Sequence, residues 1–274
     1  MAYEHIKIDR EGPVTVVTLN RPDVMNALHA PAHFELHEAF DAFAADPDQW
    51  VAIVTGAGER AFSAGNDLKH QASGGGMGLP PSGFAGLTQR FDLNKPLIAA
   101  VNGVAMGGGF EIALACDLII AADTATFALP EPRVGLAALA GGLHRLPRQI
   151  GLKAAMGMIL TGRRVAAAEG QALGFVNDVV PAADLMDAAR RWAAQICELS
   201  PMSIRASKEA VFKGLDEPSL EAAMAGQMRY PATAAMLRSE DFKEGPRAFA
   251  EKRKPNWQGR CGGCEGLRAA QWCN

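Results

Sequence analysis

The sequence predicts an α/β fold, because strand patterns and helix patterns alternate along its first two thirds. Short apolar runs rich in β-branched residues at 14–19, 50–55 and 97–101 are typical of buried strands. Between the first two runs, residues 31–43 carry apolar side chains at helical spacing. Glycines follow the third run and a helix pattern follows the glycines, so the alternation continues and indicates an α/β core.

The last third of the chain is expected to be helical. Beyond Gly142 the apolar residues recur at helical spacing, and one strand pattern at 175–180 interrupts them. This change of pattern predicts a core over residues 1–195, a C-terminal helical region over 196–258 and a disordered tail over 259–274. The helical region is expected to supply contacts between subunits.

Composition and charge narrow the classes of function. The chain has 274 residues, 49% of them hydrophobic, and a net charge of −3. A charge so close to balance argues against a nucleic-acid-binding surface. No apolar run reaches the ~18 residues of a membrane span, and the N-terminal residues contain no apolar signal core. We therefore expect a soluble, cytoplasmic protein that binds neither nucleic acid nor membrane.

The cysteines predict no metal site. Cys116 and Cys197 lie in apolar helical patterns and are expected to be packed thiols. The other three, Cys261, Cys264 and Cys273, lie in the expected tail. One pair has the C-x-x-C spacing, but no second pair or histidine follows it, so a zinc site is incomplete.

The first candidate site is the stretch from Lys95 to Asp123. Its strand pattern leads into a tight turn and a run of glycines, Gly107 to Gly109, where a helix begins. Glycines let a ligand lie against bare backbone, and the first amides of a helix point outward with the positive end of its dipole. The spacing fits neither a dinucleotide motif nor a P-loop. The expected anion is therefore a polarised carbonyl oxygen rather than a phosphate.

Two glutamates are candidate acid–base groups. Glu111 lies in the first turn of the helix, although an acid there can also serve only the helix dipole. Glu131 lies between two prolines that fix the backbone, although by itself it could be an exposed loop carboxylate. Two carboxylates can divide the activation of water from proton transfer to carbon. The apolar neighbours expected to raise the carboxyl pKa values by burial are Phe127, Leu129, Leu136 and Leu139.

A second loop could complete the anion site. Residues 61–69 form a turn of small residues that leads into a helix, with Asp67 as its possible cap. Amides of this turn and of the glycine run would together make an oxyanion hole. Residues 70–88 are rich in Gly, Ser and Pro, which predicts a mobile loop or lid. His144 is expected to be a surface residue without a catalytic or metal-binding role.

These motifs resemble those of the enoyl-CoA hydratase/isomerase family, the crotonase superfamily. The resemblance rests on AFSAGNDLK at 61–69, AVNGVAMGGGFEIALACD at 100–117 and FALPEPRVGL at 127–136, and it extends over about residues 1 to 260. It implies a spiral of repeated β-β-α units with a C-terminal helical trimerisation region, assembled as a homotrimer or hexamer. It also implies an acyl-CoA thioester as substrate and no metal or redox cofactor.

The resemblance assigns roles to particular residues. It implies that the amides of Asn66 and Gly108 form the oxyanion hole, and that Glu111 and Glu131 are the hydratase acid–base pair. The residues that it places along CoA are Met25, Ala27, Ala64, Asp67, Leu68 and Lys69, with Phe249 and Lys252 reaching CoA from a neighbouring subunit.

The predicted activity is that of an enoyl-CoA hydratase, which adds water reversibly across the α,β double bond of an enoyl-CoA thioester. Within the family, GFAGLT at 83–88 is most similar to the carnitinyl-CoA dehydratases, but Leu139 stands where that group carries an aspartate. An enoyl-CoA isomerase would need the same oxyanion hole and one acid. A thioester hydrolase, a carbon–carbon lyase and an inactive acyl-CoA-binding homologue also remain open.

Overall fold

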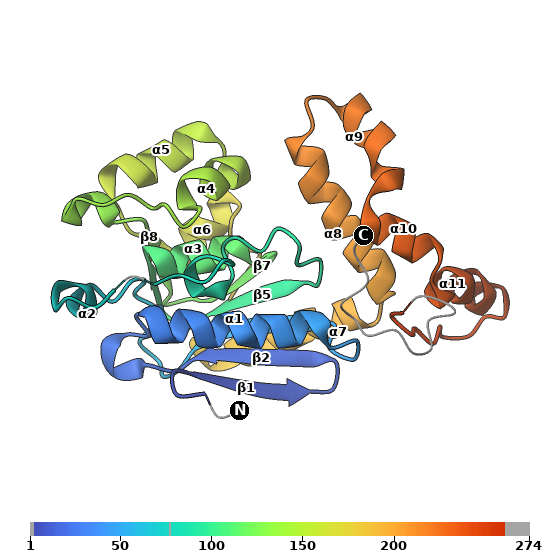
Figure 1. Ribbon diagram of the computed structural model, residues 1–274, viewed down its shortest axis with the longest axis horizontal. Coiled ribbons are helices and arrows are strands. Elements are labelled where there is room, and N and C mark those ends of the chain that lie inside the picture. The colour runs from blue at the N-terminus through green and yellow to red at the C-terminus, as the bar shows by residue number, and fades with distance from the viewer. Residues whose placement is uncertain (1–2, 77, 261–274) are drawn as a thin grey trace.

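The computed structural model describes residues 3–76 and 78–260 of the chain. Figure 1 shows a body of sheets and helices, and a group of C-terminal helices that stands beside it. The C-x-x-C cysteines and most of the expected tail lie outside the described residues. Gly259 is described and belongs to the folded part, because its amide donates to Asp241 Oδ1 at 3.2 Å.

The larger sheet is parallel except at one edge. Its first two strands form an antiparallel pair, and each later strand is parallel to its neighbour. The strands, in spatial order, are β1 (Ile6–Glu11), β2 (Val14–Leu19), β3 (Val51–Gly56), β5 (Leu97–Val101), β7 (Leu118–Ala122) and β10 (Asp178–Val180).

The smaller sheet is built by the alternate strands. Along the chain, β3, β5 and β7 enter the larger sheet, and the strand that follows each of them enters the smaller one. This repetition is the predicted spiral of β-β-α units, which the structure confirms. The strands of the smaller sheet are β4 (Ala61–Ser63), β6 (Val104–Met106), β8 (Thr126–Ala128) and β9 (Val165–Ala166), with β9 antiparallel to β8 and the others parallel.

The central strands are apolar throughout because they are covered on both faces. Every residue of β3 and β5 is buried. Helix α7 (Leu185–Cys197) packs against β3, β5 and β7, and α3 (Gly108–Ala115) also contacts β5 and β7. A strand buried on both faces reads as a continuous apolar run rather than an alternating one, which is why these strands were visible in the sequence.

Helices fill the connections between strands. Helix α1 (Ala30–Ala45) precedes β3, and the short α2 (Leu68–Ala72) follows β4. Asp67 caps α2 as predicted, since its carboxylate accepts from the amide of His70 at 3.1 Å. Between β8 and α7 lie η3 (Glu131–Val134), α4 (Gly142–Ile150), α5 (Leu152–Thr161) and α6 (Ala167–Leu173).

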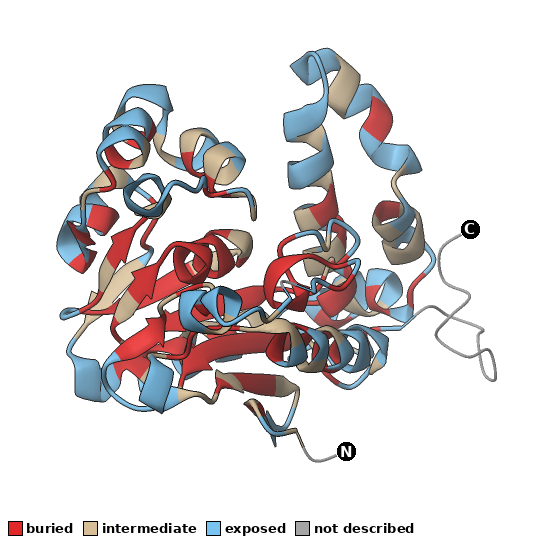
Figure 2. Cartoon of the chain, turned by 60° about the vertical axis from the view of Figure 1, so that its left-hand side comes forward, coloured by how far each residue is buried: buried red, intermediate tan, exposed pale blue. Residues whose placement is uncertain are grey.

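The C-terminal helices form an arm beside the body (Figure 1). Much of the arm is exposed in the single chain, whereas the central strands of the body are buried (Figure 2). The expected domain boundary at 195/196 falls inside the last turn of α7, and the arm begins at Pro201. The arm consists of α8 (Pro201–Asp216), α9 (Leu220–Gly226), η5 (Gln227–Arg229), α10 (Pro231–Leu237) and α11 (Glu240–Ala250).

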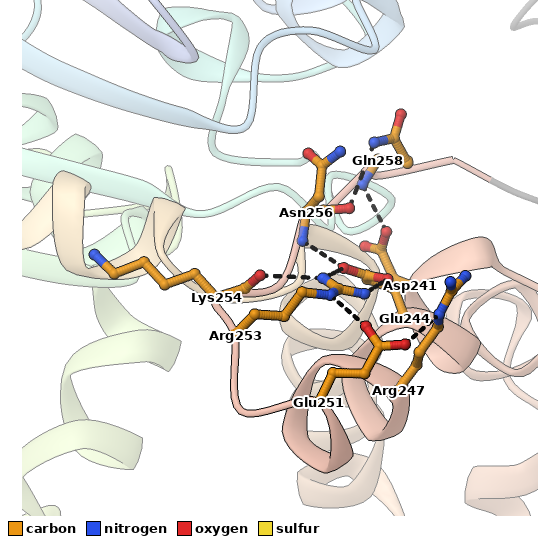
Figure 3. A network of polar contacts seen from close by, with 8 residues as sticks. All are labelled: Asp241, Glu244, Arg247, Glu251, Arg253, Lys254, Asn256 and Gln258. Carbon is orange, nitrogen blue, oxygen red and sulfur yellow. Dashed lines mark hydrogen bonds and ion pairs between the residues drawn. The ribbon is translucent and has the colours of Figure 1, made fainter.

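Polar contacts fix the chain after α11. The guanidinium of Arg253 bonds both carboxylate oxygens of Glu244 and one oxygen of Glu251 (Figure 3). Glu251 also accepts from Arg247 at 3.0 Å, and Glu244 from the amide of Asn256 at 2.7 Å. The charged residues named here therefore have a structural role, which is to hold the chain after α11 in place.

The prediction of a mobile loop over residues 70–88 is wrong for its second half. Residues 82–88 are buried and include η2 (Phe84–Gly86). The amide of Ala85 donates to Nδ1 of His33 at 3.0 Å, and the ring of Phe84 lies 4.4 Å from that imidazole. Glycines and a left-handed Ala85 make the turn that directs Phe84 inward. The glycine-rich composition of residues 82–88 therefore reflects a tight turn rather than a mobile loop.

Candidate functional site

The site lies where the three parallel strands of the smaller sheet end. The turn at Gly65 and Asn66 follows β4, the glycine run follows β6, and Glu131 follows β8. Carboxyl ends of parallel strands meet at one edge of a sheet, where ligands of α/β proteins usually bind. A hydrogen bond of 2.9 Å from the amide of Gly107 to the carbonyl of Ala128 ties two of these ends together.

Each glycine of the run meets a different neighbour at close range. Gly107 has φ 54° and ψ −126°, and a Cβ there would lie 2.9 Å from Oε1 of Glu131. A Cβ on Gly108 would lie 2.5 Å from the ring of Phe84. A Cβ on Gly109 would collide with the carbonyl of Ser63. The run therefore lets backbone, ring and carboxylate converge on the first turn of α3.

The two expected oxyanion donors come from adjacent turns. A Cβ added to Gly65 would lie 2.8 Å from the amide nitrogen of Gly108, so the turns after β4 and β6 touch. Gly108 begins α3, and a first helical amide has no acceptor within its own helix. Asn66 forms a bridge with Leu28 that uses the carbonyl of Gly65 and the amide of Asp67. Among the described residues, neither expected donor amide bonds to a protein acceptor.

Glu111 is buried beside these amides. Its residue is 3% exposed, and its Oε1 accepts from the amide of Gly142 at 2.8 Å. Burial raises the pKa of Glu111 to about 7, and the negative charge of Glu131 acts in the same direction. The amides of Gly142 and Ala140 and the charge of Arg145 oppose the rise. Such a carboxyl can both accept and release a proton near neutral pH.

Glu131 faces the glycine run from the other side. It begins η3, and its Oε2 is buried without a hydrogen-bond partner among the described residues. Burial also raises the pKa of this carboxyl above its ordinary value. A buried, unsatisfied carboxyl oxygen is costly to a fold, so its presence beside a second carboxyl points to chemistry.

The expected apolar surroundings are only half present. Phe127 and Leu129 are buried as predicted, at 0% and 1% exposure. Leu136 and Leu139 are 46% and 80% exposed in this chain, so the prediction that they bury the carboxyls is wrong here. Residues 132–137 are all exposed, and the left-handed Gly135 ends η3 within this surface segment.

The expected CoA-binding residues fall into two separate places. The first set lies where loop 21–28 pairs with the segment after β4: the amide of Ala64 donates to the carbonyl of Met25 at 2.9 Å. Asp67 is already bonded to Arg21 at 3.0 Å. This first set consists of Met25, Ala27, Ala64 and Asp67, with Leu68 and Lys69 exposed in the first turn of α2.

The second set lies far away on the arm. Phe249 is 87% exposed near the end of α11, and Lys252 follows it on the surface. Helices α2 and α11 lie at opposite ends of the molecule (Figure 1). One chain therefore does not bring the two sets together.

Two features of the site were missing from the sequence interpretation. His144 is exposed as expected, but its neighbour Arg145 is partly buried and acts on Glu111 through its charge. Phe84 lies in the segment expected to be a mobile loop and instead covers Gly108. The buried positions Gly142 and Leu146, four residues apart, mark the inward face of α4 and could have indicated that Arg145 lies beside it.

A row of imidazoles lies near α2. The ring centroids of His5 and His29 are 4.5 Å apart, and those of His29 and His70 are 5.2 Å apart. The described part of the chain nevertheless contains no group of three or more His, Cys, Asp or Glu side chains arranged to hold a metal ion. Nor does any helix in that part have the length and apolar character needed to cross a membrane.

Known proteins of the same fold resemble this chain over nearly its whole length. A carnitinyl-CoA dehydratase of Salmonella arizonae is 48% identical over 262 residues, covering 93% of this chain and 99% of that protein. A crystal structure of an enoyl-CoA hydratase from Mycobacterium tuberculosis is 38% identical, with a TM-score of 0.87 over 93% of this chain and 99% of that one.

A third relative is a carnitinyl-CoA hydratase of Mycobacterium avium. Its crystal structure is 39% identical, with a TM-score of 0.74 over 93% of this chain and 99% of that one. The sequence pattern described as enoyl-CoA hydratase/isomerase matches residues 9–260, which is nearly the whole chain. The protein therefore belongs to the enoyl-CoA hydratase/isomerase family.

Proposed function

We propose that this protein is an enoyl-CoA hydratase, a hydro-lyase that adds water reversibly to the α,β double bond of an enoyl-CoA thioester. The family of the chain and its named relatives support hydratase or dehydratase chemistry on CoA thioesters. The observation that carries the proposal is the pair of buried carboxyls beside two backbone amides without protein acceptors. An isomerase would need only one of those carboxyls.

The amides of Asn66 and Gly108 would bind the thioester carbonyl oxygen. Negative charge develops on this oxygen when a nucleophile attacks the β carbon, because the π electrons move toward the carbonyl. Preorganised amides at such a position stabilise the enolate-like transition state, and one such donor is worth roughly 2.7–4 kcal/mol. The positive end of α3 adds to the same effect.

The two carboxyls would divide the proton transfers. Ionised Glu111 holds the water and takes one of its protons as the water oxygen bonds to the β carbon. Protonated Glu131 gives a proton to the α carbon as the enolate collapses. The two groups then exchange the proton, which restores the starting state. Because their charges interact, they titrate as one coupled pair.

Binding of CoA would need more than one subunit. We place the first set of CoA contacts, from Met25 to Lys69, on one chain and Phe249 and Lys252 on a neighbour. Exposed apolar side chains on the arm support a homotrimer or hexamer: Val211, Phe212, Leu215, Leu220, Met224 and Met228. The proposed enzyme needs no metal or redox cofactor and acts in the cytoplasm.

Carnitinyl-CoA dehydration is a second candidate for the physiological reaction. The relatives with that name are 46–48% identical to this chain. Both reactions use the same proton transfers, and they differ in whether the acyl chain carries a trimethylammonium group. The residues of the site therefore support hydration or dehydration of a CoA thioester. The identity of the acyl chain distinguishes an enoyl-CoA hydratase from a carnitinyl-CoA dehydratase.

An assay over several substrates tests the proposal. The loss of enoyl-thioester absorbance would be followed with enoyl-CoA esters of increasing chain length and with crotonobetainyl-CoA. Hydration of at least one unbranched enoyl-CoA at a rate typical of enzymes is the expected result. Preference for crotonobetainyl-CoA would favour carnitinyl-CoA dehydration as the physiological reaction. The absence of hydration with every ester would contradict the proposal and favour an inactive acyl-CoA-binding protein.

A further inference from the structure

Arg145 bridges two segments beside the proposed site. It is the fourth residue of α4, and its Nη2 donates to the carbonyl of Thr88 at 2.8 Å. Its Cζ lies 5.7 Å from the centroid of the Phe91 ring. A Cβ on Gly141 would collide with its Nη1, so the guanidinium lies directly against that glycine. The side chain thus joins the start of α4 to the segment that follows η2.

The charge of Arg145 has no ion-pair partner among the described residues. Burial lowers the pKa of Arg145, and Cys116 and then the charge of Glu111 oppose this effect. Arg145 and Glu111 therefore interact through space, without a direct hydrogen bond or ion pair. By contrast, Arg148 lies one turn further along α4, is exposed and bonds the carbonyl of His144 at 3.1 Å.

We propose that Arg145 is a positioning residue for hydration, which holds the Gly141–Gly142 turn against Glu111 and supplies the positive charge that balances the two carboxyls. The inference rests on the proposed function for its kinetic consequence. The turn matters because the amide of Gly142 is the hydrogen-bond donor to Oε1 of Glu111. The charge matters because two buried carboxyls repel each other when both are ionised.

The direction of the effect follows from the groups that face Glu111. Glu131 comes from η3, the amides of Ala140 and Gly142 precede or begin α4, and Arg145 lies within α4. Removal of the arginine charge takes away one of the influences that oppose the repulsion by Glu131, while the amides of Gly142 and Ala140 remain. The pKa of Glu111 then rises further, so that this base is ionised only at a higher pH. The acid limb of kcat/KM should move in the same direction.

The test compares pH profiles of kcat/KM for Arg145→Gln, Arg145→Lys and Arg148→Gln. We expect Arg145→Gln to move the acid limb upward by a fraction of a pH unit, because the charge of Arg145 is the smallest of the influences on the pKa of Glu111. Arg145→Lys keeps the positive charge but loses the planar guanidinium, whose two terminal nitrogens contact Thr88 and Gly141. It should keep the wild-type limb with a lower kcat. Arg148→Gln should match the wild type in both respects.

A different set of results would show that Arg145 has only a structural role. A similar loss of kcat for Arg145→Gln and Arg145→Lys at every pH, with no shift of the limb, would overturn the inference. If Arg145→Gln does not fold, Arg145→Met keeps the apolar stem and carries the same expectation. Carbon-13 NMR titration of the glutamate carboxyls measures the Glu111 shift without turnover. It tests the inference separately even if the wild-type protein hydrates no enoyl-CoA.

Discussion

The carboxylates of the site and those of the arm show opposite behaviour for the same residue type. Glu111 is 3% exposed and Glu131 is half-buried, and burial raises both pKa values, to about 7 for Glu111. Glu244 and Glu251 keep 16% and 45% side-chain exposure. Hydrogen bonds from Arg253 lower both of their pKa values, to about 2 for Glu244.

The difference teaches how to separate chemistry from scaffolding. A carboxylate that is buried without a bound cation costs the fold free energy and gains proton-transfer capacity near neutral pH. A surface carboxylate held by arginine is ionised at every physiological pH, and it fixes a chain segment. Exposed ion pairs add little to stability, so the role of the Arg253 network is to shape the chain after α11.

The largest expected effect follows from neutralising a site carboxyl. Glu111→Gln and Glu131→Gln should each lower kcat by roughly 10²–10⁴, the usual contribution of one acid–base group. The side-chain carbonyl of the Glu111→Gln variant would still accept from the amide of Gly142, so the melting temperature should change little. Steady-state hydration kinetics measure the effect, and Glu244→Gln is the control on the arm with unchanged kcat. Near-normal hydration by either site variant would remove that residue from the mechanism.

Much of the body was predictable from the sequence because its strands are buried on both faces. The runs at 14–19 and 97–101 coincide with β2 and β5 to the residue. The cap at Asp67 and the helix start at the glycine run follow from local rules that do not depend on the rest of the fold. The spiral itself came from the family resemblance.

The site was less predictable, because it depends on close approaches between distant segments. Phe84 covers Gly108 from a segment whose composition indicates a loop. Arg145 reaches Thr88, which is 57 positions away in the sequence. Leu139 is exposed because the chain runs along the surface between η3 and α4, although its apolar character favoured burial. No local pattern records such contacts.

The second prediction concerns the oxyanion donors. Gly108→Val should lower kcat by at least ~10²-fold through loss of one donor's geometry. Its Cβ would also press on the Phe84 ring, so the same change should be made together with Phe84→Leu to relieve that contact. The double variant should remain slow. Asn66→Ala should be much milder, because the Asn66 side chain bonds Gln71 at 2.7 Å on α2.

A restored rate in the double variant would show that displacement of Phe84, and not the donor amide, causes the loss. An Asn66→Ala enzyme as slow as Gly108→Val would give the asparagine side chain a role that the proposed mechanism lacks.

The third prediction concerns pH. Since the folded-state pKa of Glu111 is raised to about 7 from 4.5, the native state binds more protons than the unfolded state between those values. The contribution of Glu111 to the free energy of unfolding should fall as pH rises through this window. Chemical unfolding at several pH values measures it, with Glu111→Gln as the reference. A pH-independent difference between the two proteins would contradict the raised pKa.

Glu244 should show the reverse. Its folded pKa is lowered to about 2, so its stabilising contribution is present above its ordinary value of 4.5 and is lost as pH falls toward 2. Glu244→Gln should therefore be slightly less stable than the wild type at neutral pH, because exposed ion pairs add little, and should converge with it in acid. Glu111 and Glu244 thus test the contrast between site and arm in two different pH ranges, above and below the ordinary glutamate pKa of 4.5.

The smallest expected effect lies at the end of the arm. If Lys252 reaches CoA on a neighbouring subunit, Lys252→Ala should raise KM roughly two- to fivefold, the size of one exposed ion pair, with kcat unchanged. Lys254→Ala is the matched control, because the main chain of Lys254, through its carbonyl, is what binds Arg253. A light-scattering mass of one subunit would rule out a lysine supplied by a neighbour.

The central claim is that the two carboxyls and two amides add water to an enoyl-CoA thioester. The most direct test incubates the purified protein with crotonyl-CoA in deuterium oxide and identifies the product by NMR. The proposed mechanism predicts a 3-hydroxyacyl-CoA with one solvent deuterium on the α carbon, absent when the Glu111→Gln variant replaces the wild type. An unsaturated isomer or free CoA as the product would contradict it, and so would the absence of hydration with crotonyl-CoA and with every longer enoyl-CoA ester.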